Sequence, residues 1–131
     1  MKRRMGSESK QTRGQDAENF AATFLSGQGA EIVARNVSGR HGEIDLVVRH
    51  DNYLVFVEVR LRNHRGFADG AESVDARKQR KLIATAAQYL QRHYRDRPPS
   101  CRFDVLALTG GLKGDTSYSA EWIKDAFRPD F

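Results

Sequence analysis

The sequence predicts an α/β fold in which a central mixed β-sheet lies between helices in three layers, α/β/α. Two segments, residues 15–28 and 73–94, carry apolar residues at helical spacing. Between and after them lie β-branched runs of strand length. Helical and strand segments that alternate in this way favour a sheet covered on both faces. The chain has 131 residues, enough for one domain with one core.

The first predicted helix spans residues 15–28. Its apolar side chains fall on one face, and they are Ala17, Phe20, Ala21, Phe24 and Leu25. Gly27 and Gly29 mark its end. Glu18 follows Ala17, so we expect it at the edge of the buried stripe. We expect residues 1–12, which are polar and charged, to form a flexible basic tail before a single domain that spans residues 13–131.

Three strands should follow this helix. Residues 30–35 form the first, 36–41 a turn, and 42–48 and 53–61 a hairpin closed by residues 50–52. Both faces of residues 53–61 are mostly apolar, which predicts a central strand.

The second half begins with a loop at 63–70 and a long helix at 73–94. Pro98 and Pro99 end that region, and residues 102–108 read as a further strand. Within residues 118–127 we expect a short strand and then a short helix that carries Trp122, Ile123 and Phe127.

The charge balance favours an anionic partner. Lys and Arg total 22 against 17 for Asp and Glu, which gives a formal net charge of +5. Such a balance suits nucleic acid or an acidic membrane surface. Cys101 is the one cysteine, so no internal disulfide can form, and we expect a cytoplasmic protein. No apolar run has transmembrane length, and the opening MKRRMGSESK does not resemble a signal peptide.

Two carboxylates interrupt the apolar hairpin. Asp45 and Glu58 lie on its neighbouring strands, where a buried charge is costly unless something pairs with it. One or two Mg²⁺ ions held by such carboxylates support phosphodiester hydrolysis. Glu18 is the candidate third carboxylate, and the carbonyl of Val59 could add an oxygen. In the alternative reading, the two acids are strand-end carboxylates paired with arginines such as Arg49 and Arg60.

Five blocks in order resemble the YraN-like family of small bacterial proteins, distant relatives of the archaeal Holliday junction resolvases. They are DAENFAATFLSGQGAEIVARN, GEIDLVV, FVEVR, RKQRKLIATAAQYL and RFDVLAL. Asp45 and Glu58-Val59-Arg60 also resemble the D…(D/E)-x-K signature of the restriction-endonuclease-like nucleases. This resemblance implies a restriction-endonuclease-like fold in which Glu18, Asp45 and Glu58 hold Mg²⁺ or Mn²⁺. Arg60 stands where the signature has lysine, and arginine cannot act as a general base, although it can clamp phosphate.

The resemblance implies a nucleic-acid-binding protein that acts as a Mg²⁺-dependent endonuclease on structured or branched DNA. Asp45, Glu58 and Arg60 would be catalytic, and Lys78 or Lys81 are candidate substitutes for the signature lysine. A homodimer would suit a junction substrate. The expected nucleic-acid contacts are Arg40, His41, Arg60, Arg62, Arg77, Lys78 and Lys81. Two alternatives stay open: a non-catalytic DNA- or RNA-binding module on the same scaffold, and a protein-interaction scaffold.

Overall fold

The structure is a computed structural model that describes residues 13–62, 74–110 and 118–129. Its elements in chain order are helix α2 (Arg13–Gly27), strands β1 (Glu31–Gly39), β2 (Gly42–His50) and β3 (Tyr53–Arg62), helix α3 (Ala76–Tyr94), and strands β4 (Cys101–Gly110) and β5 (Tyr118–Phe127). The expected tail at residues 1–12 and most of the expected loop at 63–70 lie outside the described residues.

The strands form one mixed sheet in the order β1-β2-β3-β4-β5. Only the β3–β4 pair is parallel among the described pairs. Parallel neighbours need a crossover connection, and α3 lies within the segment that joins β3 to β4. The predicted α/β fold with a mixed sheet is therefore confirmed, whereas its placement among restriction-endonuclease-like folds stays a prediction. No helix within the described residues is long and apolar enough to cross a membrane.

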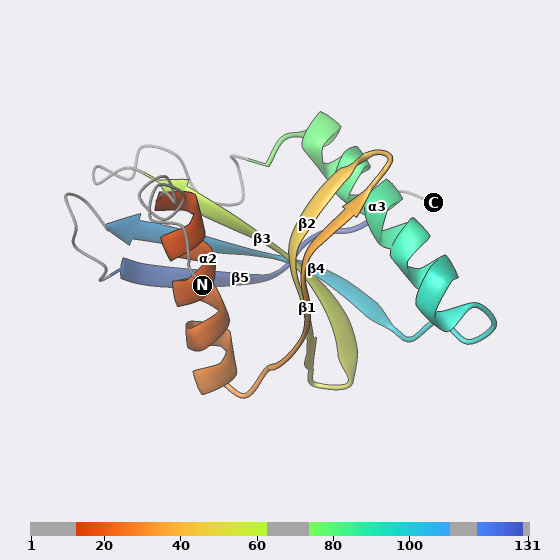
Figure 1. Cartoon of the computed structure of the whole chain (residues 1–131), viewed down its shortest axis with the longest axis horizontal. Coiled ribbons are helices and arrows are strands. Elements are labelled where there is room, and N and C mark those ends of the chain that lie inside the picture. Colours follow the sequence, from red (N-terminus) through yellow and green to blue (C-terminus); the bar gives the residue numbers. More distant parts are fainter. Residues whose placement is uncertain (1–12, 63–73, 111–117, 130–131) are drawn as a thin grey trace, which may run out of the picture.

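Each face of the sheet is covered by one helix (Figure 1). Alternating residues of the central strands point to opposite faces, as the pleat requires. One core joins α2 to the sheet through Ala17, Ala21, Leu25, Leu46, Val48, Val55, Val57, Leu106 and Leu108. The other joins α3 to the opposite face through Ile44, Val47, Leu54, Phe56, Leu82, Ala86, Phe103 and Val105. The predicted three layers are thus present.

Helix α3 begins at Ala76, three residues later than the sequence pattern predicted. Asp75 is its N-cap, and the Asp75 side chain accepts a hydrogen bond of 2.9 Å from the amide of Lys78. Val74 is buried in the core although it precedes the helix. The apolar pattern therefore located the buried residue correctly, but the cap residue sets where the helix starts.

Strand β1 extends further than predicted. Residues 36–39, which were expected in a turn, continue β1 and pair with β2 as far as Gly39↔Gly42. Asn36 adopts a left-handed φ of 50° within this strand, a conformation that asparagine tolerates better than most residues. The hairpin between β2 and β3 is confirmed, and Asp51 and Asn52 close it with φ of 52° and 67°.

The predicted helix near the end of the chain is wrong. Residues 118–127 form one strand, β5, which pairs with β4. Its register shifts between Phe103 and Val105, where the amide of Asp125 donates to Oδ1 of Asp104 at 2.9 Å. This bulge interrupts the strand alternation, so the apolar residues fall at a spacing that imitates a helix. Trp122 and Phe127 still pack against the two cores, as expected.

Candidate functional site

The sheet divides at Asp45 and Glu58. Pairing between β2 and β3 ends at Leu46↔Val57, while β3 continues beside β4 as far as Arg62↔Thr109. Asp45 and Glu58 are the next residue on each strand, so they face one another across the point where the strands part. Figure 1 shows the β1–β2 hairpin and the end of β3 leading to different sides of the molecule.

A side chain replaces the missing ladder bond at this fork. The amide of Val59 donates to Oδ2 of Asp45 at 2.8 Å. The backbone of β2 also twists here, because Ile44 packs on the α3 side whereas Leu46 packs on the α2 side. Two residues apart, these side chains would share a face in a regular strand. The twist leaves the Asp45 side chain at the fork.

Burial and neighbouring charge make Asp45 unusual. Its pKa is raised from 3.8 to about 7, first by desolvation on burial and next by the charge of Glu58. The amide of Val59 opposes this rise, while Glu18 and Glu43 add smaller increases. Glu58 is itself only 6 % exposed. Two carboxylates at such a place repel one another, so a cation between them would stabilise both in the charged form.

Glu58 has two cationic neighbours from different elements. Its Oε2 lies 3.3 Å from Nζ of Lys78 on α3 and 3.7 Å from Nη1 of Arg60 on β3. The predicted partnership of Glu58 with Arg60 is therefore present. Arg49 instead pairs with Glu31 at 3.6 Å, so the alternative prediction that Arg49 pairs with this acid pair is wrong. Of the two candidate lysines, Lys78 is the one that contacts a site carboxylate.

Glu18 approaches from α2 and is held by β1. With the Asn36 amide turned so that its nitrogen faces the carboxylate, it donates to Oε1 at 3.0 Å and to Oε2 at 3.3 Å. Glu18 is half-buried, as expected at the edge of the helix stripe. Asn36 was not anticipated from the sequence. Its amide orients Glu18, and its left-handed backbone lies between the pairs Arg35↔Leu46 and Val37↔Ile44 of the β1–β2 register.

The Asp45–Glu58 pair suits a hard divalent cation in its donor chemistry. Carboxylate oxygens are the ligands that Mg²⁺ prefers, and the cation would relieve the repulsion that raises the Asp45 pKa. In the described part of the chain, no group of three or more His, Cys, Asp or Glu side chains is placed to hold a metal together. Two carboxylates with waters and a substrate phosphate are a usual Mg²⁺ set, and Glu18 stays a predicted third ligand.

The predicted nucleic-acid contacts fall into separate groups. Arg40 and His41 form the exposed turn of the β1–β2 hairpin, and the Arg40 amide donates to Oε1 of Gln88 at 3.2 Å. Arg77 and Lys81 are exposed on α3. Arg62 is engaged elsewhere, because it donates to Thr109 and to Glu121, each at 2.9 Å.

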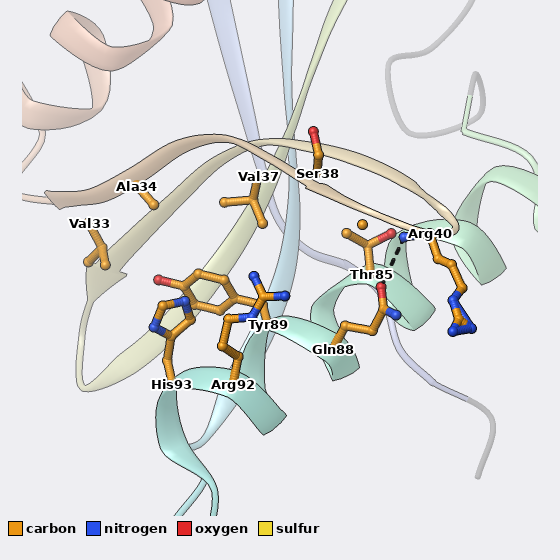
Figure 2. A pocket seen from close by; sticks show the side chains of 11 residues that line it. Val33, Ala34, Val37, Ser38, Arg40, Thr85, Gln88, Tyr89, Arg92 and His93 are labelled. Atoms are coloured by element: carbon orange, nitrogen blue, oxygen red, sulfur yellow. Dashed lines mark hydrogen bonds between the residues drawn. The ribbon is translucent and has the colours of Figure 1, made fainter.

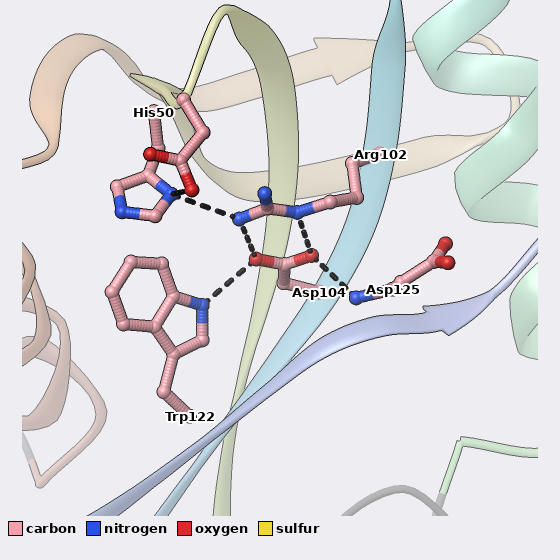
Figure 3. Close-up of polar contacts among 6 residues, drawn as sticks. His50, Arg102, Asp104, Trp122 and Asp125 are labelled. Carbon is pink, nitrogen blue, oxygen red and sulfur yellow. Dashed lines mark hydrogen bonds and ion pairs between the residues drawn. The ribbon is translucent and has the colours of Figure 1, made fainter.

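A second polar cluster, which the sequence reasoning missed, lies at the other end of the sheet (Figure 3). Asp104 is completely buried and accepts four hydrogen bonds. Two come from Arg102 at 2.9 Å each, one from Nε1 of Trp122 at 2.8 Å, and one from the Asp125 amide. A nitrogen of Arg102 also lies 3.2 Å from Nδ1 of His50. In the sequence, this cluster is indicated by Arg102 and Asp104, a charged pair two residues apart in the apolar run RFDVLAL.

The donors around Asp104 identify this second cluster as structural. The hydrogen bonds to Asp104, together with its charge, raise the pKa of Arg102 despite its burial. With both oxygens of Asp104 accepting two bonds each, the carboxylate is satisfied by the protein alone. The cluster ties β4 to β5 and to the β2–β3 turn, and it explains why a charged pair is tolerated in the core.

Comparison with known proteins places these sites in a family. The profile described as "Uncharacterised protein family UPF0102" matches residues 17–108, a span that includes Glu18, Asp45, Glu58 and Lys78. The chain belongs to the UPF0102 family. A UPF0102 protein of Alcanivorax borkumensis is 45% identical over 119 residues, covering 91% of this chain and 94% of the relative. One of Methylobacillus flagellatus is 46% identical over 114 residues, covering 87% and 95%.

Further UPF0102 relatives agree with this assignment. A protein of Dichelobacter nodosus is 44% identical over 113 residues and covers 86% of each chain. The resemblance drawn from the five sequence blocks is thereby confirmed at the level of the UPF0102 family and of its occurrence in bacteria. The wider relation to nucleases stays a prediction.

Proposed function

We propose that this UPF0102 chain binds nucleic acid and hydrolyses phosphodiester bonds in structured or branched DNA with Mg²⁺ or Mn²⁺. The observation that carries the proposal is the facing pair Asp45 and Glu58 at a fork of the sheet, with Lys78 against Glu58 at 3.3 Å. The raised pKa of Asp45, caused by burial and by the neighbouring charge of Glu58, is a feature that functional sites share, and it supports the proposal. We also propose that the protein is cytoplasmic and that it acts as a homodimer, which would suit a junction substrate.

Each residue of the fork would have its own task. Asp45 and Glu58 would hold the cation, which supplies charge neutralisation and an activated water when bound. Arg60 presents a guanidinium that can clamp a phosphate through two hydrogen bonds. Lys78 places an ammonium beside Glu58, from which it can orient the attacking water or stabilise charge on the phosphate. Lys78 from α3 would thus take the place of the signature lysine, where this chain has Arg60.

The charge on α3 supports a polyanionic substrate. Five Lys and Arg residues and no Asp or Glu lie between Ala76 and Tyr94. The helix begins at the fork, so its basic side chains continue outward from the carboxylate pair. A phosphate backbone would release counterions from such a surface, which makes binding favourable and dependent on salt.

One observation favours a second candidate, a nucleic-acid-binding module without catalysis. Glu58 already has Lys78 and Arg60 within 4 Å, so the charge cluster is partly balanced by the protein itself. Arg60 cannot take a proton from water at neutral pH. In this candidate the fork would position the basic surface, and the acids would have no turnover role.

A cleavage screen separates the two candidates. Branched, flapped and linear DNA and a structured RNA would be incubated with the protein in Mg²⁺ or Mn²⁺ at pH 8. The endonuclease proposal expects cleavage of a branched or flapped DNA that Asp45→Asn and Glu58→Gln abolish. Asp96→Asn, which changes an exposed acid outside the fork, is the matched control.

Binding in EDTA completes the comparison. A binding module would retain salt-sensitive affinity for DNA or RNA and cut none of these substrates with either metal. Absence of both cleavage and binding at moderate salt would refute both candidates and leave the interaction scaffold.

A further inference from the structure

A groove of about 790 Å³ lies between β1 and α3 (Figure 2). It is formed where edge strand β1 crosses the helix. Its apolar floor includes Val33, Ala34 and Val37, which pack against the α3-side core. None of the residues of the fork line it. The groove is therefore a separate concave surface that the proposed metal chemistry does not use.

One face of α3 connects the groove to the fork. Lys78, Lys81, Thr85, Gln88 and Arg92 recur every three or four residues, which places them along one side of a helix. Lys78 contacts Glu58, and Gln88 accepts the amide of Arg40 at the hairpin turn. Arg92 lines the groove. At 1.5 Å per residue, Arg92 lies roughly 20 Å along the helix from Lys78.

The groove is cationic at both ends. Figure 2 shows Arg40 at the hairpin end, with Arg92 and His93 at the opposite end. Among the described residues that line it, none is Asp or Glu. Guanidinium groups match phosphate geometry, so this arrangement attracts a ligand with repeated negative charge rather than a neutral one.

An aromatic wall distinguishes the groove from a purely electrostatic surface. The rings of Tyr89 and His93 lie 4.3 Å apart, and Tyr89 is fixed edge-on to Phe56 at 6.0 Å. Aromatic side chains bind nucleic-acid bases through their flat faces, and only unpaired bases offer those faces. A duplex presents base edges and phosphates, and an acidic peptide presents no base at all.

We propose that the groove between β1 and α3 binds an unpaired, single-stranded segment of nucleic acid. Its phosphates would lie against Arg40 and Arg92, and a base would lie against Tyr89 and His93. The inference rests on the proposed nucleic-acid binding but not on cleavage. It names the substrate feature that the protein selects: a single strand that leaves a branch or flap and follows α3 away from the fork.

Fluorescence anisotropy in EDTA tests the groove without any turnover. The probes are a labelled 12-nucleotide oligothymidylate and a blunt hairpin duplex that carries the same label. Arg40→Ala with Arg92→Ala should weaken oligothymidylate binding by about tenfold or more and change duplex binding much less. The matched control is Arg97→Ala with Lys124→Ala, which removes two exposed charges outside the groove.

The aromatic contact has its own variants. Tyr89→Phe keeps the ring and should bind the oligothymidylate as the parent does. Tyr89→Leu removes the ring and should lower the affinity several-fold. Photocrosslinking of an oligonucleotide that contains 5-iodouracil should label a peptide carrying Tyr89 or His93. Circular dichroism melts establish that each variant is folded. If Tyr89→Leu unfolds, the oligothymidylate affinity of the Arg40→Ala with Arg92→Ala variant still tests the groove.

Three results would overturn the inference. The first is an equal loss of oligothymidylate affinity in the Arg40→Ala with Arg92→Ala variant and in the control variant. The second is photocrosslinking only to peptides that lack Tyr89 and His93. The third is displacement of the oligonucleotide by polyglutamate at equal charge concentration, which would identify an acidic peptide site. If the duplex binds and the Arg40→Ala with Arg92→Ala variant binds oligothymidylate as the parent does, the groove proposal is wrong while the proposed nucleic-acid binding still holds. If neither probe binds, the proposed nucleic-acid function fails with it.

Discussion

The amide of Val59 donates to Oδ2 of Asp45 at 2.8 Å where β2 and β3 part. The side chain supplies the acceptor that the departing strand no longer offers, so the fork keeps its backbone satisfied. The same bond holds a carboxylate opposite Glu58, at the edge of two cores. Asp45 is thus a structural closure of the sheet and the centre of the proposed site, and the two roles can be separated by experiment.

Asp45 should make stability depend on pH. Its folded pKa, about 7, lies above the ordinary 3.8, so the folded state holds a proton that the unfolded state has released between these values. Stability should therefore fall as pH rises from about 4 to about 7. Asp45→Asn keeps an acceptor for Val59 and removes the charge.

Thermal melts at several pH values measure this effect. The variant should melt at a higher temperature than the parent at pH 8, and the difference should shrink at pH 5. Asp96→Asn serves as the control for loss of an exposed charge. Parallel pH profiles for the parent and Asp45→Asn would show that the pKa of Asp45 is not raised.

Lys78 should be required for cleavage and Lys81 should not. Lys78 lies 3.3 Å from Glu58, whereas Lys81 is exposed one turn further along α3. Lys78→Met should lower the cleavage rate at saturating DNA by roughly 100-fold or more, the usual effect of removing a positioned group that stabilises charge in the transition state. Lys81→Met should change mainly the DNA affinity.

Single-turnover rates at saturating protein separate the two effects. Equal losses of rate in Lys78→Met and Lys81→Met would contradict the assignment. Lys78→Arg tests whether charge alone suffices, since it restores the cation without an ionisable base.

Asp104 should dominate the stability of the β4–β5 side. It is fully buried and accepts four hydrogen bonds, two of them from Arg102. Asp104→Ala leaves the Arg102 cation buried without its partner, which should cost about 3–5 kcal/mol. Urea unfolding followed by Trp122 fluorescence measures the loss, because the indole donates to the same carboxylate at 2.8 Å. A loss below about 1 kcal/mol would mean that the Asp104 cluster does not tie β4 to β5.

The sequence predicted well wherever one local pattern controls the structure. Alternation in the run YLVFVEVR places Glu58 at the end of a buried face, and the structure agrees. It failed for residues 118–127 because Asp104, about 20 residues earlier, accepts the Asp125 amide and creates a bulge. The apolar spacing of β5 is a product of that contact, which no local window contains.

The candidate site divides in the same way. Asp45 and Glu58 could be found from the sequence, because each interrupts a β-branched run. The choice between Lys78 and Lys81 could not, since it depends on how α3 is rotated on the sheet. The role of Asn36 could not be predicted, because it depends on the contact of α2 with β1. The groove could not be predicted either, because it forms only where β1 crosses α3.

A Mn²⁺ titration by isothermal calorimetry at pH 8, comparing the parent with Asp45→Asn and Glu58→Gln, measures whether the fork binds a divalent cation. If these two carboxylates form the cation site, the parent should bind Mn²⁺ with defined stoichiometry, and each variant should lose that binding while keeping its fold. Asp96→Asn should bind as the parent does. A Mn²⁺ affinity that Asp45→Asn leaves unchanged would contradict the account.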